Sequence, residues 1–190
     1  IDALGASDAI VIGHDWGALA AYGAAALGPD QVKKLLVIAI PHPASLKPSL
    51  TKLWRGRHFV AYKLPGASNR FARNDFAALP AIYRRWSPMW NPDPTEFDAV
   101  RASFSNRASL NAAFGYYRKL SAIPTASLKA PITVPVIAFA GLDDPMVAPS
   151  DYRSAARMFE SEYIVEEVPG GHFMHREHPE AFAERLLTHL

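Results

Sequence analysis

Three short stretches of the sequence place reactive side chains next to glycines. Asp15 is the centre of GHDWG at residues 13–17, Asp144 lies in GLDDP at residues 141–145, and His172 follows a glycine pair. A carboxylate can attack an electrophilic carbon, and a histidine oriented by a second carboxylate can activate water. The chain therefore carries, in this order, the groups of a nucleophile, an acid and a general base.

Each of these residues also has a purely structural interpretation. Asp and Gly favour turns, so GHDWG alone is compatible with an ordinary turn. One of Asp143 and Asp144 fits a turn or helix-capping residue, and His172 alone fits a surface position. His175 and His178 lie nearby, but their spacing does not match the HExxH arrangement, so we expect no metal. The combination of three motifs in this order is what favours catalysis.

Four apolar runs predict the strands that carry these residues. Such runs are typical of parallel strands that are buried on both faces. The predicted strands are Ala9–Ile12, Lys34–Ile40, Val134–Ala140 and Tyr163–Val168. Asp15 follows the first strand, Asp144 follows the third, and His172 follows the last. Because ligands of such sheets bind outside the carboxyl ends of the strands, we expect the three side chains to meet there.

Helices are predicted around these strands and in a long middle segment. The Ala-rich stretch Gly17–Leu27 favours a helix, and Pro179–Leu190 begins with a proline that the first turn tolerates. The other predicted helices are Ser150–Phe159 and, in the aromatic and proline-rich middle, about Leu46–Arg55, Asn74–Arg85, Glu96–Phe104 and Ser109–Leu120. We therefore expect a core layer at 1–43, a helical cap (lid) at 44–131, and a second core layer at 132–190.

The composition excludes several classes of protein. The 190 residues suffice for one domain with a real core, and 49% hydrophobic and 20% charged residues are globular values. A formal net charge of +2 gives no reason to expect nucleic-acid binding. Without cysteine there is no disulfide, thiolate metal site or cysteine nucleophile. No apolar run approaches the roughly 18 residues of a membrane span.

The motifs resemble those of the epoxide hydrolase and haloalkane dehalogenase branch of the α/β-hydrolases, over the whole chain. The matching stretches are GHDWG (13–17), PHP (41–43), RRWSPMW (84–90), GYYR (115–118), GLDDP (141–145) and GGHFMHREHP (170–179). The resemblance implies an α/β-hydrolase fold in which Asp15 occupies a nucleophile elbow, whose flanking glycines would prevent Cβ clashes. It makes Asp144 the acid, because this residue directly precedes Pro145, and His172 the base.

The resemblance also implies an activity. Asp15 would open an epoxide through an alkyl-enzyme ester, water activated by His172 would hydrolyse that ester to a diol, and the Trp16 N–H would complete an oxyanion site. Related enzymes donate a proton from the lid, which makes Tyr117 and His58 the expected substrate-binding pair and Tyr62 the substitute for His58. These lid residues are also compatible with packing alone. No cofactor is implied, and the expected substrate is a small apolar epoxide or organohalide.

Two other functions stay open. A haloalkane or haloacid dehalogenase would use the same Asp15 nucleophile and would need halide donors, one of which could be Trp16. Fluoroacetate-type enzymes carry Arg after the nucleophile, where this chain has Trp16. Alternatively, the chain is a non-catalytic binding protein of the same fold, or an inactive fragment.

The number of strands bears on what the sequence covers. An elbow normally lies on a central strand, whereas only one predicted strand precedes Asp15. We therefore expect the C-terminal half of a sheet, with the N-terminal strands missing and needed for activity, and an open edge on the first strand. The start of the chain has no signal-peptide pattern, and we expect a cytoplasmic protein. A homodimer stays open.

Overall fold

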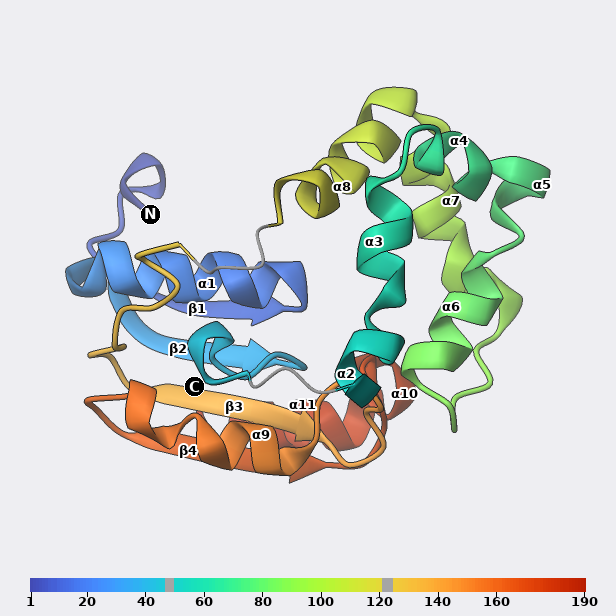
Figure 1. Ribbon diagram of the computed structural model, residues 1–190. Coiled ribbons are helices and arrows are strands. Elements are labelled where there is room, and N and C mark those ends of the chain that lie inside the picture. Colours follow the sequence, from blue (N-terminus) through green and yellow to red (C-terminus); the bar gives the residue numbers. More distant parts are fainter. Residues whose placement is uncertain (47–49, 121–124) are drawn as a thin grey trace.

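A four-stranded parallel β-sheet forms the centre of the chain (Figure 1). The computed structural model describes residues 1–46, 50–120 and 125–190. The strands are β1 (Ala9–His14), β2 (Val32–Ile38), β3 (Val136–Gly141) and β4 (Tyr163–Val168), paired in the order β1-β2-β3-β4. All three pairings are parallel. The predicted α/β class is confirmed, and each strand lies within two residues of its predicted bounds.

Helices cover both faces of this sheet. On one face lie α1 (Trp16–Leu27) and α9 (Pro149–Ser154), and on the other lie α10 (Met174–Glu177) and α11 (Pro179–Leu187). Short 3-10 helices are found at Asp2–Leu4, Pro29–Gln31, Pro43–Ser45, Pro94–Phe97 and Ala156–Met158. No helix in the described part of the chain is both long and apolar enough to cross a membrane.

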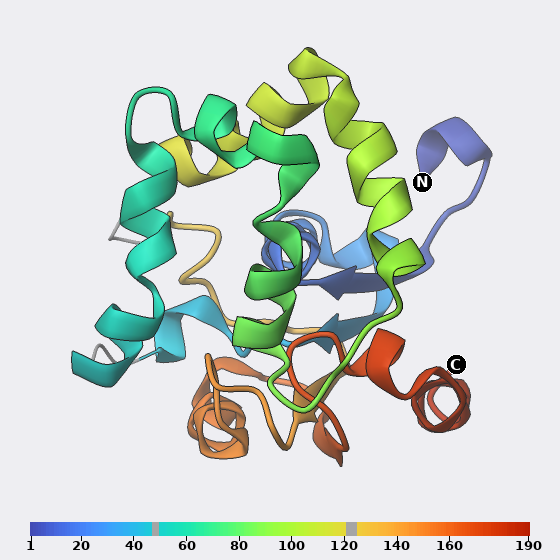
Figure 2. The ribbon, with the colours of Figure 1, turned by 90° about the vertical axis from the view of Figure 1, so that its right-hand side faces the viewer.

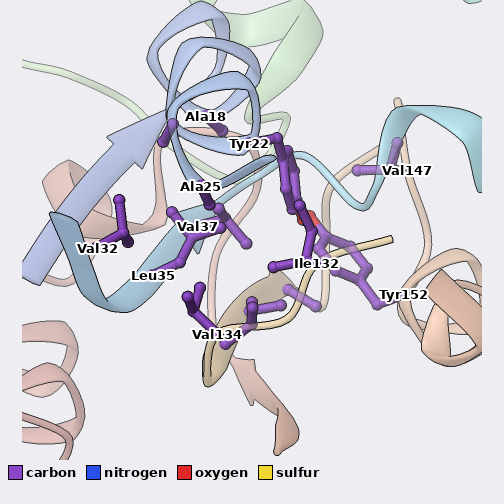
Figure 3. Close-up of a cluster of buried hydrophobic side chains, with 14 residues drawn as sticks. Ala18, Tyr22, Ala25, Val32, Leu35, Val37, Ile132, Val134, Val147 and Tyr152 are labelled. Atoms are coloured by element: carbon purple, nitrogen blue, oxygen red, sulfur yellow. The ribbon is translucent and has the colours of Figure 1, made fainter. Parts of the chain in front are cut away.

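The alternation of side chains along β2 divides the core in two. Leu35 and Val37 pack with α1 and α9, in the cluster of Figure 3 that also contains Tyr22 and Tyr152. The intervening Leu36, together with Ile38, packs with Phe139 of β3 and with α10 and α11. Successive side chains of a strand point to opposite faces, so an apolar run such as β2 is stable only when both faces are covered.

A helical insertion joins β2 to β3. It consists of α2 (Leu50–Arg55), α3 (Arg57–Lys63), α4 (Ala67–Phe71), α5 (Arg73–Phe76), α6 (Leu79–Trp86), α7 (Asp98–Ser105) and α8 (Arg107–Lys119). Figures 1 and 2 show these helices beyond the carboxyl ends of the strands. The insertion has its own apolar core, made by residues such as Phe76, Phe97 and Leu110. It can therefore hold its shape while facing the sheet.

Some of the helices predicted for the insertion were wrong. The predicted helix Asn74–Arg85 breaks at its start, where Asn74, Asp75 and Phe76 have positive φ, and α6 begins at Leu79. Asn and Asp tolerate this left-handed region better than most residues do. The helices α3 and α4 were not predicted, and α5 overlaps only the start of the predicted helix Asn74–Arg85. The predicted helix Leu46–Arg55 begins at Leu50, and residues 47–49 lie outside the described part.

The C-terminal helices also differ in length from the prediction. The predicted helix Ser150–Phe159 divides into α9 and the 3-10 turn Ala156–Met158, and α11 ends at Leu187.

Strand β1 lies at one edge of the described sheet, and its residue Ile12 is 47% exposed. The expectation that further strands precede β1 stays a prediction.

Candidate active site

The turn between β1 and α1 holds Asp15 in a strained backbone conformation. Asp15 has φ 51° and ψ −118°, a combination that costs free energy for a residue with a Cβ atom. Its neighbour Gly13 makes the turn possible, because a Cβ on Gly13 would lie 2.4 Å from the carbonyl oxygen of Gly17. A Cβ on Gly17 would meet no described atom within 4 Å, so only one of the two flanking glycines shows a steric need. The turn projects the Asp15 side chain beyond the carboxyl end of the sheet.

The structure brings the two other predicted polar residues to Asp15. His172 Nδ1 lies 2.9 Å from Asp144 Oδ2, and His172 Nε2 lies 3.4 Å from Asp15 Oδ1. The second oxygen of Asp144 accepts hydrogen bonds from the backbone N–H groups of Met146 at 2.7 Å and Val147 at 3.4 Å. Asp144 is therefore fixed in place and holds His172 with one ring nitrogen directed at Asp15.

Two carboxylates and burial determine the charge of the imidazole. Burial disfavours the charged form of His172, but its hydrogen bonds and attraction to Asp144 and Asp15 outweigh this and raise its pKa to about 10. Burial likewise acts to raise the pKa of Asp15, yet His172 lowers it below its usual value. The pair is therefore a carboxylate facing an imidazolium.

Asp15 and His172 line a cavity of about 340 Å³ between the sheet and the helical insertion. The insertion contributes His58, Phe59, Trp86 and Tyr117 to its wall, and Lys52 from α2 also lines it. The remaining lining residues are Ile40, Leu46, Met146 and Val147. The wall is mostly apolar, with a few polar groups converging near Asp15, as is usual for small-molecule sites.

The two members of the predicted lid pair differ in the proton that each carries. Burial, and to a smaller extent the nearby Asp15 charge, raise the pKa of Tyr117 above its usual value, so its hydroxyl keeps its proton at neutral pH. His58 is buried, and burial lowers its pKa to about 4, which makes the ring neutral. Its Nδ1 lies 3.3 Å from the Arg55 carbonyl oxygen and must donate there, which leaves Nε2 as an acceptor.

The other two predicted substrate-binding residues lie farther from the Asp15 cavity. The Tyr62 ring lies 4.9 Å from that of Tyr117 and 5.7 Å from that of His58, but Tyr62 is not among the described residues that line this cavity. The Trp16 ring packs on Tyr116 and Tyr117, with centroid distances of 5.5 and 5.2 Å. Trp16 is also absent from the described wall of the Asp15 cavity, so the structure places its indole against the insertion.

The end of α6 holds the backbone of His172, a contact that the sequence did not predict. The His172 N–H donates to the Trp86 carbonyl at 3.0 Å, and the Phe173 N–H donates to Ser87 Oγ at 3.1 Å. A Cβ on Gly171 would lie 2.7 Å from Ser87 Cα, so this approach requires glycine. The RRWSPMW motif was the only signal in the sequence, and it does not reveal a partner 86 residues later.

Other contacts tie the insertion to the loop that carries Asp144. From α2, Lys52 forms an ion pair with Asp151, and Arg55 donates to the carbonyl oxygen of Pro145. On the opposite side, Arg176 of α10 lies 2.6 Å from Glu96 of the insertion segment. The insertion is therefore fastened to the segments that follow Asp144 and His172.

The side chain of His14, next to Asp15, contacts the loop that carries His172. Its Nε2 donates to the His172 carbonyl oxygen at 2.9 Å, and its ring lies 4.5 Å from that of His175. Burial lowers the pKa of His14 and lowers that of His175 to about 4.

Within residues 1–46, 50–120 and 125–190, no group of three or more His, Cys, Asp or Glu side chains is arranged to hold a metal ion.

Comparison with known proteins assigns the fold. A profile described as the alpha/beta hydrolase family matches residues 1–185. The AB hydrolase superfamily protein YfhM of Bacillus subtilis is 26% identical, over 96% of this chain and 65% of that protein. Epoxide hydrolase 4 of Mus musculus is 27% identical, over 76% of this chain and 43% of that protein. This chain thus spans less than two thirds of the length of these two relatives.

Solved structures give the same fold. The epoxide hydrolase of Bacillus megaterium in complex with an inhibitor superposes with a TM-score of 0.80 and 20% identity, and the match covers 99% of this chain and 71% of that one. The family profile covers nearly the whole sequence, and the fold is that of the solved hydrolases. The chain therefore belongs to the alpha/beta hydrolase family.

Proposed function

We propose that the protein carrying this chain opens epoxides to diols, with Asp15 as the nucleophile. The observation that supports this most is a single cavity lined by the Asp15 carboxylate, the His172 imidazole and the Tyr117 phenol. These three groups supply a nucleophile, a base and a proton donor. The curated epoxide hydrolase relative supports the same reaction class.

In the first step, a carboxylate oxygen of Asp15 attacks one oxirane carbon. The bond between that carbon and the ring oxygen breaks, and its electron pair goes to the oxygen, which takes the proton of the Tyr117 hydroxyl. Burial raises the pKa of Tyr117, so the hydroxyl carries that proton at neutral pH. His58, neutral and with Nε2 as an acceptor, cannot donate the proton and would instead orient a hydroxyl group.

In the second step, His172 activates water against the ester. Ester formation removes the negative charge of Asp15, one of the two carboxylates that raise the His172 pKa, so the imidazolium loses its proton more readily. Solvent carries that proton to Tyr117, which lost its own proton in the first step. Neutral His172 then takes one proton from water, and the water oxygen adds to the ester carbonyl. The bond between the acyl carbon and the substrate oxygen breaks, the departing alkoxide takes the proton left on the added hydroxyl, and the diol leaves as the Asp15 carboxylate is restored. The backbone N–H of Trp16, the first residue of α1, would stabilise the oxyanion.

The dehalogenase alternative uses the same first attack with a halide as the leaving group. It needs N–H donors at the leaving group, and the Trp16 indole is not part of the described cavity wall around Asp15. A phenol at Tyr117 suits a departing alkoxide, which must be protonated, better than a halide, which need not be. We therefore favour epoxides. A non-catalytic protein of this fold would have no need of the strained turn at Asp15.

The experiment is to trap the ester with the variant His172→Gln. We expect the variant to react once with a styrene oxide-like epoxide and then stall, so mass spectrometry should find one adduct on the peptide that contains Asp15. Asp15→Asn should give no adduct. Asp143→Asn is the matched control: Asp143 is exposed and precedes Asp144, and this variant should turn over normally.

Three outcomes would contradict the proposal. Full turnover by His172→Gln would remove His172 as the base. Halide release from haloalkanes, without diol formation from a panel of epoxides, would replace the reaction with dehalogenation. Turnover of neither substrate class by the full-length protein would favour a binding protein.

A further inference from the structure

A second cavity lies inside the helical insertion, separate from the one that contains Asp15. Its volume is about 320 Å³, and its walls come from α3, α4, α6, α7 and α8 together with Trp16 and Phe173. Most lining side chains are aromatic or aliphatic, among them Phe71, Ile82 and Phe104, and none of the described ones is charged. Protein interiors rarely leave apolar space of this size unfilled, because every missing contact forfeits dispersion energy. We therefore expect a bound apolar group to fill this cavity.

The position of this cavity indicates what the occupant is. Trp86 and Tyr117 line both cavities, so these two side chains form the boundary between the apolar space and the Asp15 site. Tyr117 is the group proposed to protonate the leaving oxygen. A substrate held with its reacting carbon at Asp15 and its oxygen at Tyr117 has its remaining substituent beside this boundary. Only an apolar substituent matches the aromatic and aliphatic walls.

We propose that the insertion cavity binds the apolar substituent of the epoxide, which makes the preferred substrates epoxides with a large aryl or alkyl group. An apolar cavity of about 150 Å³ accommodates benzene, so about 320 Å³ accommodates a group of roughly ten carbon atoms. A fused two-ring aryl group fits this volume, whereas the substituents of three- and four-carbon epoxides leave it empty. This assignment rests on the proposed function for the chemistry, but the binding of an apolar group can be measured without any reaction.

The test compares two product-like diols, naphthylethane-1,2-diol and phenylethane-1,2-diol, by calorimetric titration of the full-length protein. Each buried methylene-sized unit contributes about fourfold in affinity, so the larger diol should bind at least tenfold more tightly. Ala113 of α8 lines the cavity, and Ala113→Phe adds a ring that fills about half of it. This variant should abolish the preference for the larger diol.

The matched control is Ala112→Phe. Ala112 precedes Ala113 on the same helix but is exposed, so the same added ring should leave the preference unchanged. Val100→Phe, which fills the cavity from α7, provides a second variant if Ala113→Phe does not fold. A preference below twofold in the parent protein would overturn the assignment, and so would an equal loss in Ala112→Phe. Tight, size-selective diol binding without epoxide turnover would refute the proposed reaction while leaving the assignment of this cavity intact.

Discussion

Replacing Asp15 with asparagine should lower the pKa of His172, because it removes one carboxylate and keeps the size of the side chain. Two unit charges 3.4 Å apart interact by about 5 kcal/mol at an effective dielectric constant of about 20, which corresponds to roughly 3.5 pKa units. The Asp15 side chain is 32% exposed, so solvent screens part of this interaction. We therefore expect a fall of about 1.5 to 3 units from the value near 10.

The direction of this shift matters for the proposed hydrolysis. The asparagine amide is neutral, as is the ester that Asp15 would form, so the variant reproduces the electrostatics of the intermediate. The remaining carboxylate, Asp144, still holds His172 Nδ1. It therefore keeps the pKa of His172 above that of a buried histidine without a partner. His172 should therefore be ready to accept a proton near neutral pH once Asp15 is esterified.

The measurement is a titration of the histidine ring signals by nuclear magnetic resonance between pH 5 and pH 11. His172 is assigned by comparison with His172→Gln. Asp143→Asn serves as the control, since this exposed neighbour of Asp144 has no hydrogen bond to the ring in the described structure. A His172 pKa in Asp15→Asn within about half a unit of the parent value would refute the reasoning, because His172 would then stay protonated beside the ester.

Three further predictions concern the surroundings of this pair. Tyr117→Phe should lower the rate of ester formation by about 10²- to 10⁴-fold in single-turnover kinetics, whereas Asp143→Asn, at an exposed position outside the described walls of both cavities, should change it little. His14→Phe should cost about 1 to 3 kcal/mol in urea unfolding, since the carbonyl of His172 loses its buried donor. The parent protein should lose stability as the pH falls from 6.5 to about 4, because the unfolded chain protonates His175 more readily than the folded one; His175→Phe should lessen that loss, and an unchanged pH profile would contradict it.

The sequence was sufficient to predict those parts of the structure that depend on local motifs. The four strands are continuous apolar runs, and each of the three polar motifs lies directly after one of them. Parallel strands end at one edge, so the meeting of Asp15, Asp144 and His172 follows from order alone. The spacing of the motifs does not show how the His172 imidazole is oriented between its two carboxylates, and only the structure gives this orientation.

The helical insertion was harder to predict because its order depends on contacts that are distant in sequence. α3, α4 and α5 are short, and short helices owe their stability to packing more than to propensity. The positive φ at Phe76 has no local sequence signal, since aromatic residues rarely adopt it. The bond between Trp86 and His172 likewise joins two motifs whose association only the fold reveals.

The contacts at Trp86, Ser87 and Gly171 have a consequence for protein engineering. Insertions of this kind are attractive units to exchange between relatives when a new substrate range is wanted. Here the end of α6 supplies two hydrogen-bond acceptors to the backbone at His172 and Phe173, and Gly171 leaves no space for a side chain at that contact. A transplanted insertion that lacks a matching end of α6 would leave the loop of His172 without its support, so the two segments must be exchanged together.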